Sequence, residues 1–157
     1  MQIEYLQDLL NYPTRPGNTK SYWFNTPIPE TEITALEDLY NNGAPFPKAL
    51  QELLYLAGDY CYVLDYGINE SQQELQEDVR ELINEYGKQI TRPFYAVDVY
   101  NGNDQCLFIY LDEGDDPFVH EGYYSDPEST WITKLKLKLS EFINYRVKRV
   151  QEGRSPF

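Results

Sequence analysis

Two apolar runs joined by a four-residue turn sequence constrain the fold of this chain more than any other feature. The runs, residues 94–100 and 105–111, flank Asn101-Gly102-Asn103-Asp104. Asn-Gly between two apolar runs is the strongest short-range signal of a β-hairpin. We therefore expect an antiparallel pair of strands here, and the aromatic run Phe118–Tyr124 predicts a further strand.

Helical spacing of apolar residues predicts four helices before this hairpin. A short helix is expected over residues 3–10, a second from Pro29 or Glu30 to about residue 41, and a third from Pro47 to Gly58. The fourth, over residues 71–86, begins with a capping box formed by Ser71 and Glu74. The apolar positions that define these helices are Ile3, Leu6 and Leu10; Ile33, Leu36, Leu39 and Tyr40; Leu50, Leu53, Leu54 and Ala57; and Leu75, Val79, Leu82, Ile83 and Tyr86.

Two further segments complete the expected element order. Tyr60–Asp65 is aromatic and β-branched, which predicts a strand. Residues 130–150 have helical spacing and predict a closing helix, although the alternation over 134–139 is also typical of a strand and leaves the start of that helix open. This order predicts an α+β fold with a central mixed or antiparallel sheet, flanked by helices at 30–41, 47–57 and 131–150. We expect a single domain, with a helix and an extended lead-in over residues 1–29 and the core over 30–157.

The chain is strongly acidic, and its charge is unevenly distributed. The net charge is −13 over 157 residues, but residues 131–157 hold only two acids against seven bases. An acidic body repels nucleic acid and attracts basic partners, so we expect no direct nucleic-acid binding. The first residues lack the basic region of a signal peptide, and no apolar run is long enough to span a bilayer. We therefore expect a cytoplasmic protein.

The residues that enzymes and metal sites usually need are scarce. His120 is the only histidine, and Cys61 and Cys106 are the only cysteines. A cysteine nucleophile with His120 as its base is a formal alternative, but no catalytic signature surrounds either cysteine. We expect two reduced, buried thiols, no enzymatic activity, no cofactor and no metal site.

Two groups of residues are candidates for binding a protein partner. The densest acidic run has Asp112, Glu113, Asp115 and Asp116, and its alternative reading is a charged turn between strands. Tyrosines beside carboxylates suit the capture of Arg or Lys, and their alternative role is to pack the core. The predicted anchors of this second group are Tyr62, Asp65, Tyr66, Tyr123 and Tyr124.

Residues 29–58 resemble the SUKH superfamily. The first motif is a helix of the form I-x-x-L/I-E, matched by Ile33, Leu36 and Glu37, and the second is a Pro-initiated helix that ends at a small residue. The second motif is matched by Phe46, Pro47, Leu50, Leu53, Leu54 and Gly58. The resemblance implies a central sheet flanked by helices, and it gives no catalytic set. The chain departs from the family by Ala57-Gly58-Asp59 after the third helix and by an insertion, the acidic helix 71–86.

The resemblance also implies a role, because many bacterial members of the superfamily are immunity proteins that bind and neutralise toxins, often nucleases. We therefore expect a monomeric, cytosolic binding protein whose acidic loop faces a basic site on a toxin, with the predicted anchors beside that loop. One alternative is an inhibitor that mimics DNA, with the acids of helix 71–86 spaced like phosphates. Another is a regulatory interaction scaffold.

Overall fold

The computed structural model describes residues 1–17, 24–66, 68–127 and 130–157. The described chain contains α1 (Gln7–Asn11), α2 (Glu30–Tyr40), α3 (Lys48–Ala57), α4 (Gln72–Glu85), β1 (Phe94–Tyr100), β2 (Gln105–Tyr110), β3 (Phe118–Tyr123), β4 (Ile132–Lys138) and α5 (Leu139–Gln151). The four strands form one antiparallel sheet in the order β1-β2-β3-β4. The α+β class and the flanked antiparallel sheet are therefore confirmed. The expected extended lead-in falls partly on residues 18–23, which lie outside the described residues.

The hairpin predicted from Asn-Gly is present between β1 and β2. Asn101, Gly102 and Asn103 all have positive φ, of 53°, 63° and 68°. Asparagine and glycine tolerate this left-handed conformation better than other residues. The turn thereby reverses the chain in four residues and sets Tyr100 opposite Gln105.

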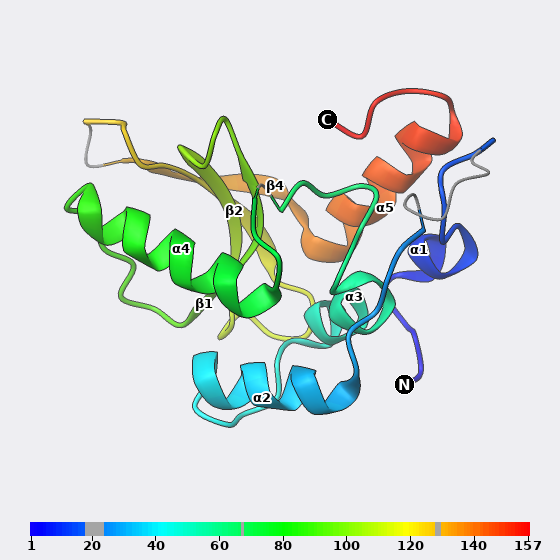
Figure 1. The fold of residues 1–157 in the computed structure, drawn as a ribbon, viewed down its shortest axis with the longest axis horizontal. Helices are drawn as coiled ribbons and strands as arrows, with labels where there is room; N and C mark the ends of the chain where they lie inside the picture. The colour runs from blue at the N-terminus through cyan, green and yellow to red at the C-terminus, as the bar shows by residue number, and fades with distance from the viewer. Residues whose placement is uncertain (18–23, 67, 128–129) are drawn as a thin grey trace.

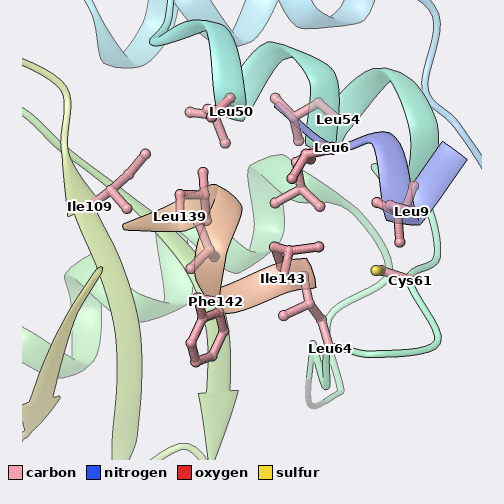
Figure 2. Packing of buried hydrophobic residues seen from close by; sticks show 14 of the residues in the cluster. Leu6, Leu9, Leu50, Leu54, Cys61, Leu64, Ile109, Leu139, Phe142 and Ile143 are labelled. Carbon is pink, nitrogen blue, oxygen red and sulfur yellow. The ribbon is translucent and has the colours of Figure 1, made fainter. Parts of the chain in front are cut away.

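Helices cover both faces of the sheet. Figure 1 shows α4 on one side of the strands and α1, α3 and α5 on the other. The larger hydrophobic cluster lies between α1, α2, α3, α5 and one face of the sheet, and Figure 2 shows leucines of α1 and α3 facing Leu139 and Ile143 of α5. The smaller cluster lies between α4 and the opposite face, around Phe108 and Trp131. Apolar residues therefore alternate between two buried faces, and strands β1 and β2 are buried along almost their whole length.

The motif residues of α2 and α3 hold these two helices together. The carboxylate of Glu37 is buried and accepts hydrogen bonds from the backbone N–H of Phe46 and the side-chain amide of Gln51, both at 2.8 Å. Gly58 ends α3 where an added Cβ would lie 2.5 Å from the carbonyl oxygen of Leu54 and 2.7 Å from Ile28. These contacts give the motif a structural role in the connection between the helices.

The predicted strand Tyr60–Asp65 is wrong. Tyr60 makes one isolated bridge with Thr26, and residues 61–64 then turn with all four side chains buried. The backbone N–H of Tyr62 donates a hydrogen bond to the side-chain oxygen of Asn25, and the backbone N–H of Asp65 donates one to the carboxylate of Asp98. Side-chain acceptors thus satisfy these backbone groups without strand pairing.

The predicted closing helix begins later than its spacing suggested. Residues 132–138 form β4, and α5 starts only at Leu139. Glu141 accepts the backbone N–H of Lys138, and Asp116 accepts that of Ser140, so two carboxylates satisfy the start of the helix. Three side chains expected in buried stripes are instead exposed: Leu10, Leu39 and Tyr86.

Candidate functional site

The predicted acidic loop is largely engaged with its own chain. Arg92 donates hydrogen bonds to Asp112 and Glu113 and stacks on the ring of Tyr110 at 3.9 Å. The hydrogen bond from Arg92 lowers the pKa of the Asp112 carboxyl below its usual value. Asp116 accepts bonds from the backbone N–H and hydroxyl of Ser140, at 3.0 and 2.7 Å. Three of the four predicted acids therefore stabilise the connection between β2 and β3 or the start of α5.

The predicted aromatic anchors are mostly part of the core. Tyr62 is buried and donates to the carbonyl of Tyr12, while the half-buried Tyr66 donates to the carbonyl of Ala57. Tyr124 is fully buried, and only Tyr123 and Asp65 are exposed. Burial raises the pKa of Tyr62 to about 12. The core-packing alternative therefore describes three of these tyrosines.

The structure separates the two groups that were predicted to lie side by side. The acidic loop joins the end of β2 to the start of β3, whereas Tyr123 ends β3 at the hairpin end of the sheet. A six-residue strand is about 17 Å long. Asp65 lies on the hairpin side as well, since its carbonyl accepts the backbone N–H of Val99.

A different acidic surface forms where α4 passes the tip of the hairpin. A hollow of about 330 Å³ is lined by Asp78, Glu81, Leu82 and Glu85 of α4 together with Gly102 and Asn103. A second hollow of about 190 Å³ at the same hairpin tip is lined by Asp65, Ile68 and residues 99–103. We call the residues that line the two hollows, with Glu74, the α4–hairpin surface. Its two halves share Gly102 and Asn103.

Four acids of α4 form one stripe along the helix. Glu74, Asp78, Glu81 and Glu85 are separated by four, three and four residues, so they share one face over about 16 Å. None of the four forms an ion pair with another described residue. Arg80, the only base of α4, lies instead against the rings of Tyr40 and Phe94 and donates to the carbonyl of Phe94. The stripe is therefore negative charge without a cationic partner among the described residues, although Asp78 accepts a hydrogen bond from the side chain of Asn69 and Glu74 accepts one from the backbone N–H of Glu70.

Apolar side chains lie beside this stripe. Ile68 is 83 % exposed, Tyr86 is 48 % exposed, and Leu82 is half-buried. An apolar patch rimmed by one sign of charge suits a protein partner of the opposite sign. The sequence contained the signal for this surface in the acidic face of helix 71–86. Its proximity to the hairpin tip and Asp65 was not visible in the sequence.

The candidate catalytic residues lie in the core. Cys61 belongs to the cluster under α5, whereas Cys106 and His120 belong to the opposite face of the sheet. Burial raises the pKa of both thiols to about 12, which opposes formation of the nucleophilic thiolate. His120 stacks on Phe108 and contacts Tyr110, and its Nδ1 lies 3.1 Å from the Phe118 carbonyl. Packing and hydrogen bonding within the domain account for all three positions.

No group of three or more His, Cys, Asp or Glu side chains in the described parts of the chain is arranged to hold a metal ion. No helix within those parts has both the length and the apolar character that crossing a bilayer requires. Comparison with family models, curated proteins and solved structures finds no match to this chain.

Proposed function

We propose that this protein is a non-enzymatic binding domain whose α4–hairpin surface covers a basic site on a protein partner. The observation that carries the proposal is the stripe Glu74, Asp78, Glu81 and Glu85, four exposed or half-exposed carboxylates without an ion pair among the described residues. The loop at residues 112–116 is a weaker candidate, because ion pairs with Arg92 already compensate the charge of Asp112 and Glu113.

Charge and apolar contact would have separate roles at this surface. A stripe of like charge attracts a basic partner before contact and speeds association. After contact, the exposed Ile68 and the half-buried Leu82 offer apolar area that is removed from water. Truncation of such contacts acts mainly on the dissociation rate.

A protein toxin is the class of partner that we propose, and the protein would act as its cytosolic immunity protein. The resemblance of residues 29–58 to the SUKH superfamily supports this class. The acidic stripe adds an electrostatic reason within this class: a nuclease must bind phosphate, so its active cleft is basic and fits an acidic stripe. The same stripe also supports a second candidate, an inhibitor that mimics DNA and blocks DNA-binding proteins in general.

The test compares two variants that remove the same amount of charge. The stripe variant carries Glu74→Gln, Asp78→Asn, Glu81→Gln and Glu85→Gln. The control carries Glu4→Gln, Glu32→Gln, Asp38→Asn and Asp59→Asn, four exposed or half-exposed acids elsewhere that form no ion pair with a described residue. The products of the genes adjacent to the gene of this protein are tested as partners, and association rates are measured at two salt concentrations.

The stripe variant should associate about tenfold or more slowly at low salt and should lose most of the salt dependence. The control should associate like the wild type. Equal rates for the two variants would mean that only net charge matters, and the α4–hairpin surface would then be the wrong site. Inhibition of several unrelated DNA-binding proteins, with no protection against the toxin, would favour the DNA mimic.

A further inference from the structure

Strand β4 is an edge of the sheet and has two chemically different faces. Within the described residues it pairs only with β3. Lys134, Lys136 and Lys138 are exposed on one face, while Leu135 and Leu137 pack partly against the larger core cluster on the other. The edge therefore presents a row of cations on one side and apolar side chains on the other.

Backbone hydrogen bonds at both ends of β4 show which residues face outward. The carbonyl of Trp131 accepts from Tyr123, and the N–H of Leu139 donates to Pro117. Between the pairs His120–Lys134 and Phe118–Lys138, β4 has two more residues than β3, and residues 135–137 have no paired partner on β3. Exposed and half-buried side chains still alternate through this stretch, which places odd-numbered residues on the β3 side. The backbone groups of Lys134 and Lys136 consequently face away from the sheet, as does the N–H of Lys138, which Glu141 accepts.

A hollow lies next to this edge, on its leucine side. It measures about 410 Å³ and is lined mainly by Leu135, Leu137, Phe142, Tyr145, Arg149 and Phe157. Its polar lining is basic: Lys136 and Arg149 contribute, and a hydrogen bond from Arg149 lowers the pKa of the Tyr145 hydroxyl. An apolar hollow with cations at its rim suits an apolar side chain from an acidic segment.

We propose that the β4 edge binds an extended segment of a protein partner in which acidic and apolar residues alternate. The segment would pair with the outward backbone groups of Lys134 and Lys136 as an added strand. Its acids would face the lysine row, and its apolar side chains would enter the hollow beside Leu135 and Leu137. This site is separate from the α4–hairpin surface and does not rest on the function proposed for it.

A second copy of this chain does not fit the edge. Antiparallel pairing of β4 with its own copy would set lysines directly opposite lysines on one face, and like charges opposite each other destabilise a sheet. Lysines on an edge strand oppose such self-pairing. The region from residue 131 onward holds seven bases and two acids, so an acidic strand is the complementary occupant.

The test uses a capped synthetic peptide that alternates Glu with Val and Leu, and a scrambled peptide of the same composition. Fluorescence anisotropy gives the affinity, and amide hydrogen exchange locates the bound peptide. We expect slower exchange at the Lys134 and Lys136 amides and weaker binding of the scrambled peptide. Lys134→Glu with Lys136→Glu should weaken binding about tenfold or more. Lys148→Glu with Arg154→Glu, the same charge change at two exposed residues that do not line the hollow, should leave the affinity within about twofold.

Three outcomes would overturn the proposal. If the protein binds the scrambled peptide with equal affinity, or if both double variants lose affinity equally, general electrostatic attraction accounts for the binding. Protection of amides on another element would place the peptide elsewhere. Absence of binding at peptide concentrations up to about 1 mM would show that the edge lacks the specific affinity that we propose. Because amide exchange of the free variants reports whether β3 and β4 remain paired, misfolding of a variant is distinguished from lost binding.

Discussion

Asp98 on β1 and Arg146 on α5 form an ion pair of 2.8 Å although both side chains are buried. A β-bulge turns the Asp98 side chain toward α5, because Val97 and Asp98 together lie opposite the single residue Leu107 of β2. Without the extra residue, Asp98 would follow Phe94 and Ala96 onto the α4 side of the sheet. Arg146 also donates to the carbonyl of Val63, and Asp98 accepts the N–H of Asp65. The pair therefore connects β1, α5 and the turn at residues 61–65.

Replacement of Arg146 should destabilise the domain strongly. Burial already raises the pKa of the Asp98 carboxyl to about 7, against the charge of Arg146, which lowers it. Arg146→Met would leave this carboxyl buried without its cation, at a cost of about 3–5 kcal/mol. Urea denaturation measures the change.

A double variant controls for the lost volume and contacts of the arginine. Asp98→Asn with Arg146→Met removes both charges and should recover a large part of the loss. If the single and double variants are equally stable, the stabilisation comes from packing of Arg146 against Phe142 and Phe157 rather than from the ion pair.

Adjacent acids of the 112–116 loop should differ in their effect on stability. Asp116→Ala removes both hydrogen bonds to Ser140 at the start of α5 and should cost about 1–2 kcal/mol, as the loss of a helix cap does. Asp115→Ala changes an exposed side chain and should alter the free energy of unfolding by less than about 0.5 kcal/mol. Equal effects in thermal and urea unfolding would show that the loop acids act only through their common charge.

The stability of the protein should depend on pH through His120. Burial lowers the pKa of His120 below its usual value, so the folded state takes up the imidazole proton at lower pH than the unfolded state does. As pH falls below about 6.5, the unfolded state alone gains that proton, and this contribution lowers the free energy of unfolding. Asp98 acts in the opposite direction over the same range, because its carboxyl, with a pKa raised to about 7, takes up a proton only in the folded state. Urea denaturation between pH 7.5 and 5.5, compared with a variant that lacks His120, isolates the histidine contribution.

His120→Phe is the matched variant for this pH effect, because it keeps an aromatic ring against Phe108 and removes the titrating group. Its unfolding free energy should fall less than that of the wild type over the same pH range. A parallel fall in the two proteins would assign the pH dependence to the carboxylates instead.

Features with a short-range physical cause could be predicted from the sequence. The hairpin follows from Asn101-Gly102, whose positive φ values need residues that tolerate them. The start of α4 follows from Ser71, whose hydroxyl accepts the N–H of Glu74. In both cases, residues within four positions of each other make the deciding interaction. Three acids of the α4 stripe, Asp78, Glu81 and Glu85, could be predicted for the same reason, because helical spacing alone places them opposite the apolar face.

Features that depend on a distant partner were decided only by the tertiary structure. Residues 131–139 satisfy both helical and strand spacing, and pairing with β3 together with the carboxylates of Asp116 and Glu141 selects a strand followed by a helix. The turn at residues 61–65 has strand-like composition, but its backbone is bonded by side chains from distant segments. The candidate site has the same cause: Arg92 binds the acids of the predicted loop, while the hairpin tip lies beside those of α4. Local sequence sets which groups are available, and contacts between distant segments decide which of them remain free to bind a partner.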